Sequence, residues 1–178
     1  MLHLVRGRAH QVPGLPFCGG AIGSLGYELG SRLDGNDCRS GGFPDMAVGI
    51  YTWALVWDHA SERLWQVGEP PADAVHKLER VLNGRGEDQP GRAFEPLDEL
   101  VAGLDHSAYA AAFRRIQDYL RAGDCYQVNL ARRFSVRVSG DPWAAYRDLR
   151  AASPAPFGAY LATPFGAVLS NSPEEFLS

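Results

Sequence analysis

The first half of the chain contains two apolar stretches with the composition of β-strands. Residues 46–57, MAVGIYTWALVW, are rich in Val, Ile, Tyr and Trp, and the polar residues DHAS separate them from ERLWQVGE at residues 62–69. β-branched and aromatic residues favour strands, and a short polar segment between two such runs favours a turn. The pattern therefore predicts a β-hairpin with a four-residue connection.

A helical period follows in PPADAVHKLERVLNG, residues 70–84. Apolar Val75, Leu78 and Leu82 recur at helical spacing, two prolines precede them, and Gly84 follows them. Proline in the first turn and glycine after the last are typical helix boundaries, so we expect an amphipathic helix here. The next residues, 84–92, are rich in Gly, Pro and charge and predict an exposed loop.

A second helix is predicted between residues 107 and 123. Its apolar positions are spaced by four, three and four residues, at Tyr109, Phe113, Ile116 and Leu120. Ser107 is the expected N-terminal cap and Gly123 the expected C-terminal residue.

The stretch CYQVNLARRFSVRV, residues 125–138, alternates with a period of two. Apolar residues occupy the even positions apart from Arg132, while Gln127 and Asn129 belong to the opposite, polar face. This predicts an unusually long strand with a bulge near its middle. Gln127 and Asn129 either bind a ligand or face solvent, and solvent is favoured because one-faced sheets are common.

The remaining elements complete an α+β pattern. Asp141 and Pro142 predict the start of a third helix, and FGAYLA, TPFG and AVLS, residues 157–170, predict a final hairpin. We therefore expect mainly antiparallel sheets flanked by helices.

Composition narrows the class of protein. With 178 residues, 46% hydrophobic and 21% charged, the chain has the balance of a globular domain, and its net charge of −4 argues against sequence-independent nucleic-acid binding. Three cysteines without a CxxC pair suit a reducing compartment. The longest apolar run, residues 46–57, is too short for a bilayer, and the opening MLHLVRGRAHQV does not resemble a signal peptide. A cytoplasmic protein is expected.

Local motifs alone give little chemistry. The glycine-rich stretch at residues 18–30 lacks the spacing of a dinucleotide or phosphate loop, so we interpret its glycines as sites of close backbone packing. The five histidines form no spaced pair that would suggest a metal site. In SNSPEEFLS, residues 170–178, Ser172, Pro173 and Glu175 match a helix start with a capping box. A carboxylate there becomes catalytic only within a cleft.

Five segments in order carry a family resemblance: LPFCGGAIGSLGYELGSRL, PDMAVGIYTWALVWDH, YLRAGDCYQVNLARRF, APFGAYL and LSNSPEEFL. Together they resemble component I of the aminodeoxychorismate synthases, within the chorismate-utilising family. The resemblance covers residues 15–178 and implies an incomplete portion of the anthranilate synthase component I-like fold. It divides the chain into an atypical N-terminal segment at 1–14, an N-terminal region at 15–104, and the start of a chorismate-binding region at 105–178.

The resemblance also implies an activity. The family converts chorismate and ammonia to 4-amino-4-deoxychorismate, on the route to 4-aminobenzoate and folate, with a glutamine amidotransferase partner and Mg²⁺. Glu174 matches the family's catalytic glutamate, a general acid/base, and Glu175 is then a surface residue. Pro156, Phe157 and Gly158 match a segment that contacts bound tryptophan in several members. The second wall of that tryptophan site is not recognisable in residues 1–14.

The family's remaining machinery is not found in residues 1–178. A lysine nucleophile in a PIKGT-like segment, the magnesium-binding glutamates and a GSITGAPK-like segment all follow the SPE motif in the family. We therefore expect negligible synthase activity from this chain alone, with strand edges and apolar faces left exposed. Two alternatives stay open: anthranilate synthase component I, and a non-catalytic module that binds an amino acid or docks the amidotransferase.

Overall fold

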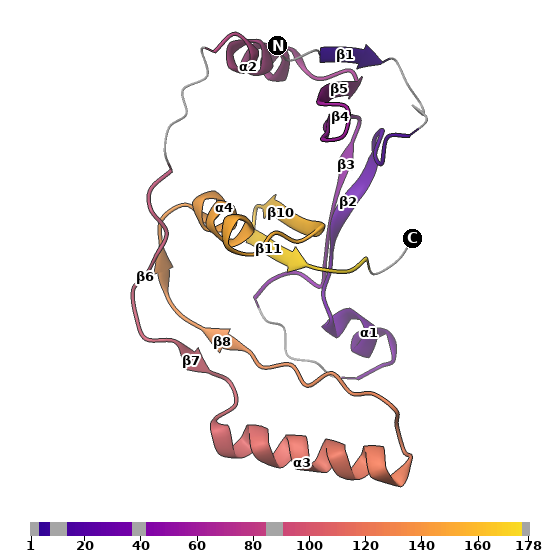
Figure 1. Ribbon diagram of the computed structural model, residues 1–178, viewed down its shortest axis with the longest axis vertical. Coiled ribbons are helices and arrows are strands. Elements are labelled where there is room, and N and C mark those ends of the chain that lie inside the picture. The colour runs from indigo at the N-terminus through magenta and orange to yellow at the C-terminus, as the bar shows by residue number, and fades with distance from the viewer. Residues whose placement is uncertain (1–3, 8–13, 37–41, 85–90, 176–178) are drawn as a thin grey trace. The chain divides into compact units, whose positions relative to one another are not determined.

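The computed structural model describes residues 4–7, 14–36, 42–84 and 91–175 (Figure 1). The chain divides into two compact units. Unit 1 comprises residues 1–89 and 159–170, and unit 2 comprises residues 90–158 and 171–178. The sequence-based division at residue 104 stays a prediction.

Unit 1 contains a three-stranded sheet in the order β1-β5-β4. Its strands are β1 (Leu4–Gly7), β4 (Trp53–Asp58) and β5 (Arg63–Gly68), with β1 parallel and β4 antiparallel to β5. Asp58 lies opposite Arg63, so residues 59–62 form the connection, and the predicted hairpin with four connecting residues is confirmed. The Asp58 carboxylate closes this turn by accepting a hydrogen bond from the Ala60 N–H at 2.9 Å.

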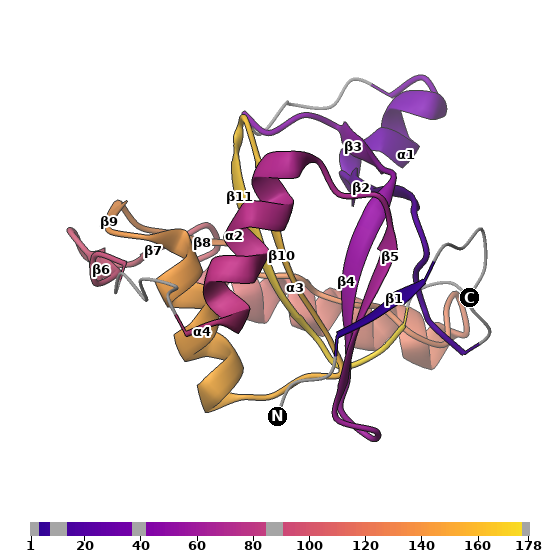
Figure 2. The same ribbon diagram turned by 90° about the horizontal axis from the view of Figure 1, so that it is seen from above.

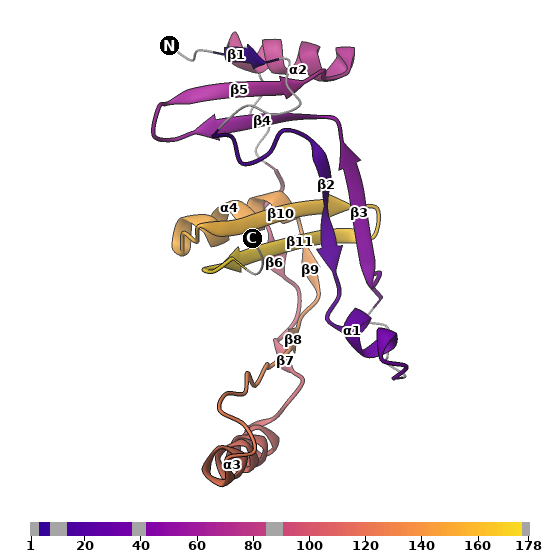
Figure 3. The ribbon, with the colours of Figure 1, turned by 90° about the vertical axis from the view of Figure 1, so that its right-hand side faces the viewer.

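A second ladder in unit 1 pairs β2 (Gly20–Leu25) with β3 (Met46–Tyr51) in antiparallel register (Figure 3). The apolar run at residues 46–57 therefore forms two strands in two different sheets rather than one arm of a hairpin. The chain changes sheet at Thr52, where Gly68 lies so close that an added Cβ would be 2.1 Å from the Thr52 carbonyl oxygen. A Cβ on Gly23 would likewise lie 2.1 Å from the Ala47 carbonyl oxygen, so close packing of this glycine is confirmed.

The other elements of unit 1 are two helices and most of a hairpin. They are α1 (Glu28–Leu33), α2 (Ala72–Leu82) and the hairpin of β10 (Phe157–Thr163) and β11 (Gly166–Ser172). Arg32 of α1 forms an ion pair with Asp45 at 2.7 Å. Figure 2 shows α2 running alongside the β1-β5-β4 sheet. Both the helix over residues 72–82 and the final hairpin were predicted correctly.

Unit 2 contains α3 (His106–Ala122), α4 (Pro142–Ala152) and two short ladders. One ladder pairs β6 (Glu95–Pro96) with β9 (Val138–Ser139), and the other pairs β7 (Val101–Ala102) with β8 (Phe134–Ser135). Gly123, with a φ of 80°, ends α3 as predicted. The N-terminal cap is Asp105 rather than Ser107: the Asp105 carboxylate accepts from the Ala108 N–H at 2.7 Å and from the Ser107 hydroxyl at 2.8 Å. The prediction failed because an aspartate two residues earlier competes for the same role. Asp141 caps α4 as expected.

The long strand predicted at residues 125–138 is wrong. Only β8 (Phe134–Ser135) and β9 (Val138–Ser139) form there, paired with β7 (Val101–Ala102) and β6 (Glu95–Pro96). In the part of the chain that the structure describes, no strand lies opposite residues 125–133, and a strand needs a partner for its backbone groups. Gln127 and Asn129 are both exposed.

Few side chains are buried among the described residues. Val67 of β5 is fully buried and Tyr146 of α4 is 8% exposed, while large apolar residues on many elements are more than a third exposed. No helix in the described ranges has the length and apolar character needed to cross a membrane. The predicted loop at residues 84–92 lies mostly outside the described residues.

Candidate functional site

Glu174 lies two residues beyond the end of β11 and is exposed. The Ser172 hydroxyl donates a hydrogen bond to the Glu174 backbone carbonyl at 2.9 Å. Ser172 is the last residue of β11, and residues 173–175 are not helical, so the predicted helix start is wrong for the described residues. The serine hydroxyl is used to close a bend after a strand, and it does not cap a helix. Residues 176–178 lie outside the described part.

Pro156 lies in the turn between α4 and β10, and Phe157 and Gly158 are the first two residues of β10. The Gly158 N–H donates to the Ala155 carbonyl at 3.2 Å, and the Phe157 side chain is 45% exposed. Phe157 is the first residue of β10 and Ser172 is the last residue of β11, and the two strands are joined by Pro164 and Phe165.

The hairpin places these candidates at the same end. Because β10 begins at Phe157 and β11 ends at Ser172, the open end of the hairpin carries both residues 156–158 and the segment leading to Glu174 (Figure 3). All of these residues belong to unit 2. The structure therefore brings together the two sequence-predicted site segments, with their side chains exposed.

Asp98 and Arg137 of unit 2 form an ion pair with two hydrogen bonds. The Arg137 Nη2 donates to Asp98 Oδ1 at 2.8 Å, and Nε donates to Oδ2. The Arg137 guanidinium holds the pKa of the Asp98 carboxyl below its usual range. At Asp105, the Ala108 N–H and then the Ser107 hydroxyl also lower the carboxyl pKa. These shifts come from an ion pair between loop segments and from a helix cap, so they indicate structural roles.

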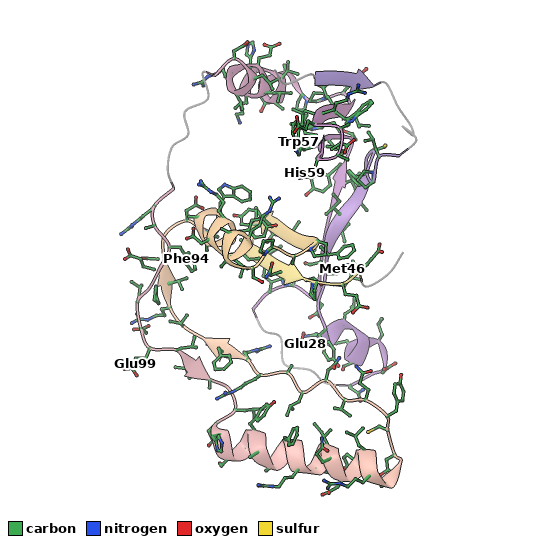
Figure 4. The ribbon with its side chains drawn as sticks, in the orientation of Figure 1. Glu28, Met46, Trp57, His59, Phe94 and Glu99 are labelled. Atoms are coloured by element: carbon green, nitrogen blue, oxygen red, sulfur yellow. The ribbon has the colours of Figure 1, made fainter. Side chains whose placement is uncertain are left out.

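Unit 1 has an apolar groove that the sequence did not reveal. Its volume is about 420 Å³, and it lies between β3 and the turn of the β10–β11 hairpin. The walls are formed by residues of β3 and by the run Leu161–Phe165, with Ile22 from β2. Figure 4 labels Met46, which contributes to this groove at the start of β3. Tyr51 and Thr163 bring hydroxyl groups, and the rest of the lining is apolar, which suits burial of apolar groups rather than acid–base chemistry.

The family resemblance implies Mg²⁺, and the described residues do not fit it by themselves. Within residues 4–7, 14–36, 42–84 and 91–175, no three His, Cys, Asp or Glu side chains cluster as metal ligands. Mg²⁺ requires oxygen ligands in octahedral geometry. No catalytic step is therefore assigned through a metal held by these residues.

Comparison with known proteins decides the family. The profile of the family described as chorismate binding enzyme matches residues 3–178. The chain belongs to the chorismate binding enzyme family. This membership confirms the resemblance seen in the five sequence segments.

Two relatives within this family illustrate the similarity. The chain is 43% identical over 171 residues to aminodeoxychorismate synthase component 1 of Klebsiella aerogenes, an alignment covering 93% of this chain and 36% of that protein. It is 35% identical over 170 residues to anthranilate synthase component 1 of Thermus thermophilus, covering 91% of this chain and 37% of that protein. The chain thus spans little more than a third of the length of the curated relatives it matches.

A solved structure supports the fold. Anthranilate synthase component I from Streptococcus pneumoniae TIGR4 matches with a TM-score of 0.69 and 27% sequence identity. The match covers 94% of this chain and 41% of that chain. The predicted α+β class, as a portion of the anthranilate synthase component I-like fold, is confirmed.

Proposed function

We propose that this chain is a portion of an aminodeoxychorismate synthase component I, which converts chorismate and ammonia to 4-amino-4-deoxychorismate. The observation that carries the proposal is its 43% identity to the Klebsiella aerogenes aminodeoxychorismate synthase component 1 over 93% of the chain. Identity to the Thermus thermophilus anthranilate synthase component 1 is lower, at 35%. The product of the proposed pathway is 4-aminobenzoate, used for folate, and we place the protein in the cytoplasm.

Glu174 is the proposed general acid/base. The C4 hydroxyl of chorismate is a poor leaving group, so its departure requires a positioned proton donor, and the incoming amine must lose a proton. A carboxyl group that does both near neutral pH needs an enclosed environment that disfavours its charged form. Glu174 is exposed among the described residues, so the proposed site requires further groups that enclose its carboxyl.

The proposed reaction also requires a nucleophile, a metal ion and a source of ammonia. The lysine nucleophile and the Mg²⁺ ligands are proposed to come from segments that follow the SPE motif in longer relatives. The name "component 1" of the relatives implies another component, and we propose a glutamine amidotransferase that supplies ammonia. The chain by itself is accordingly expected to be inactive.

Fragment complementation tests the proposal. The chain would be mixed with the part of the Klebsiella protein that lies C-terminal to the residue aligned with Ser178, and supplied with chorismate, ammonium and Mg²⁺. 4-Amino-4-deoxychorismate is measured by chromatography, and anthranilate by its fluorescence. The proposal requires the amino product from the mixture and none from the chain alone. Anthranilate as the product would favour the alternative synthase, and turnover by the chain alone would refute the assignment of missing machinery.

A matched pair of substitutions tests the role of Glu174. Glu174→Gln in the complemented mixture should lower kcat by at least about 100-fold, the typical contribution of a general acid/base. Glu175→Gln changes the adjacent exposed carboxylate and should leave kcat within about twofold. Equal effects of the two changes would remove Glu174 from the catalytic role.

Tryptophan binding at Pro156, Phe157 and Gly158 is a separate proposal for this chain. The half-exposed Phe157 ring offers an apolar contact for an indole. Calorimetric titration of tryptophan into the chain should give a heat of binding, and the Phe157→Ala variant should give none. Phe165→Ala, which alters an exposed ring at the opposite end of the hairpin, is the control. Binding without any synthase activity in the complemented mixture would favour the non-catalytic module.

A further inference from the structure

The Ser172 side chain makes a local hydrogen bond at the bend that carries the proposed general acid/base. Its hydroxyl donates to the backbone carbonyl of Glu174 at 2.9 Å. Ser172 is the last residue of β11, which pairs with β10, and it is half-buried. Pro173 and Glu174 follow in a bend and are exposed. The hydrogen bond therefore joins the residue that carries the carboxylate to the end of a paired strand.

The direction of this hydrogen bond differs from that of a helix cap. A capping serine accepts a hydrogen bond from a backbone N–H in the first turn of the helix. The Ser172 hydroxyl instead donates, and its acceptor is the carbonyl of the residue two positions later. The contact restrains the backbone of the bend and uses no atom of the Glu174 carboxyl, which stays available to a substrate.

Two restraints act on the backbone that carries the Glu174 side chain. The pyrrolidine ring of Pro173 fixes its own φ. The hydrogen bond closes a ring of atoms that also includes the ψ of Pro173 and both backbone torsions of Glu174. These torsions set the direction of the Cα–Cβ bond of Glu174 relative to β11. The Ser172 hydroxyl therefore restricts the directions in which the Glu174 side chain can leave the backbone.

We propose that Ser172 is a positioning residue, whose hydroxyl directs the Glu174 carboxyl toward the C4 hydroxyl of chorismate. This inference rests on the proposed function, which assigns the proton transfer to Glu174. Proton transfer requires the two heavy atoms to be within hydrogen-bond distance, and a small misplacement of a catalytic group lowers the rate strongly. Ser172 itself contacts no reacting atom, since its hydroxyl donates to the Glu174 carbonyl.

The hairpin offers a matched hydroxyl at its other end. The Thr163 hydroxyl donates to the Gly166 carbonyl at 2.9 Å and accepts from the Phe165 N–H at 3.2 Å. Residues 163–166 include no carboxylate, so Thr163→Ala removes a similar hydrogen bond without affecting a proposed catalytic group. A purely structural role of Ser172 predicts similar effects of Ser172→Ala and Thr163→Ala on turnover, whereas a positioning role predicts an effect of Ser172→Ala alone.

Carbonyl NMR tests the hydrogen bond in the chain alone. Residues 174–175 are the one Glu–Glu step in the sequence. Glutamate labelled with ¹³C at the backbone carbonyl and with ¹⁵N at the backbone nitrogen therefore gives one directly bonded ¹³C–¹⁵N pair, which reports the Glu174 carbonyl. Ser172→Ala should move this carbonyl resonance upfield, because accepting a hydrogen bond deshields the carbon. Ser172→Thr keeps the hydroxyl and should leave the resonance near its wild-type position, as should Thr163→Ala.

Kinetics of the complemented mixture test the positioning role. Ser172→Ala should lower kcat by about tenfold and change the KM for chorismate by less than about twofold, because the carboxyl is misdirected in the transition state while substrate binding is retained. Ser172→Thr should keep kcat within about threefold of wild type, and Thr163→Ala within about twofold.

A double substitution separates positioning from a general loss of structure. In the Glu174→Gln background no carboxyl remains to be directed, so adding Ser172→Ala should lower kcat by less than about twofold. A local disturbance at the end of β11 that acts independently of Glu174 would instead lower kcat by the same factor in both backgrounds.

Four results would overturn the proposal. They are a Glu174 carbonyl resonance that Ser172→Ala leaves unchanged, a kcat that Ser172→Ala leaves unchanged, a Ser172→Thr variant as slow as Ser172→Ala, and the same loss of kcat in both backgrounds. A wild-type mixture that forms no 4-amino-4-deoxychorismate would refute the proposed function, and the positioning role with it. The carbonyl resonance of the chain alone reports the hydrogen bond in either case, so the two failures are distinguishable.

Discussion

Replacing Val67 by alanine should destabilise unit 1 more than any change to an exposed valine. Val67 is 0% exposed and occupies the central strand of the β1-β5-β4 sheet, opposite Gly7 of β1 and Ala54 of β4. Both flanking residues are small, so they cannot fill the space that the substitution leaves. The substitution removes two buried carbon atoms without adding a polar group.

The expected cost follows from the burial. Two buried carbons are worth about 1.6 kcal/mol in transfer free energy, and the unfilled cavity raises the loss to about 2 kcal/mol. With a urea dependence of about 2 kcal/mol per M, the midpoint of unfolding should fall by roughly 1 M. Val81→Ala on α2 is the control, because Val81 is 63% exposed and should change the free energy of unfolding by less than about 0.5 kcal/mol.

Tryptophan fluorescence during urea unfolding is a suitable assay. Three of the four tryptophans, Trp53, Trp57 and Trp65, belong to β4 and β5, so the emission reports mainly on the sheet that contains Val67. If Val67→Ala and Val81→Ala shift the midpoint equally, Val67 is not the packed centre of this sheet and the reasoning fails. A change in the slope of the transition would instead show that the denatured state had been altered.

Five further substitutions, grouped in three comparisons, test particular contacts. Gly84→Ala should lower the free energy of unfolding by about 1 kcal/mol, because alanine must adopt a positive φ there. Gly68→Ala should lower it more, because the added Cβ also meets the Thr52 carbonyl oxygen. Urea unfolding of the two variants measures the difference. Asp98→Asn should reduce the loss of stability on acidification, measured as the urea midpoint near neutral pH and at about pH 3. Asp105→Ala should increase hydrogen exchange in the first turn of α3, whereas Ser107→Ala should have a smaller effect.

The sign of the Asp98 prediction follows from its ion pair. Because Arg137 lowers the pKa of folded Asp98 below the ordinary value of 3.8, the contribution to stability is present above that value. It is lost as the pH falls through the lower pKa of the folded state. A wild-type chain and an Asp98→Asn variant with the same pH dependence of stability would contradict this account.

The other comparisons have their own refuting outcomes. Equal loss of stability in Gly68→Ala and Gly84→Ala would contradict the close approach of Gly68 to Thr52. A larger effect of Ser107→Ala than of Asp105→Ala on hydrogen exchange would show that Ser107 is the N-terminal cap.

Local chemistry was sufficient to predict several elements from the sequence. The helix over residues 72–82, the C-terminal end of α3 at Gly123 and the hairpin between β4 and β5 depend on residues close together in the chain. The motif containing Glu174 and the segment at Pro156 were also identifiable, whereas their position at one end of the hairpin was established from the structure. These features follow from spacing, capping and turn preferences, which act over a few residues.

Only the tertiary structure determined which strands pair and which surfaces are covered. A two-residue period places Tyr126 and Val128 on one side of an extended segment, but strand pairing requires a partner, and the ladders there extend over two residues each. The same limit applies to the run at residues 46–57, which changes sheet at Thr52. The sequence alone determined the family, the local elements and the candidate carboxylate. The pairing of β2 with β3, the groove beside β3 and the exposure of apolar side chains such as Leu25 and Ile50 depend on contacts between distant residues, which no local pattern encodes.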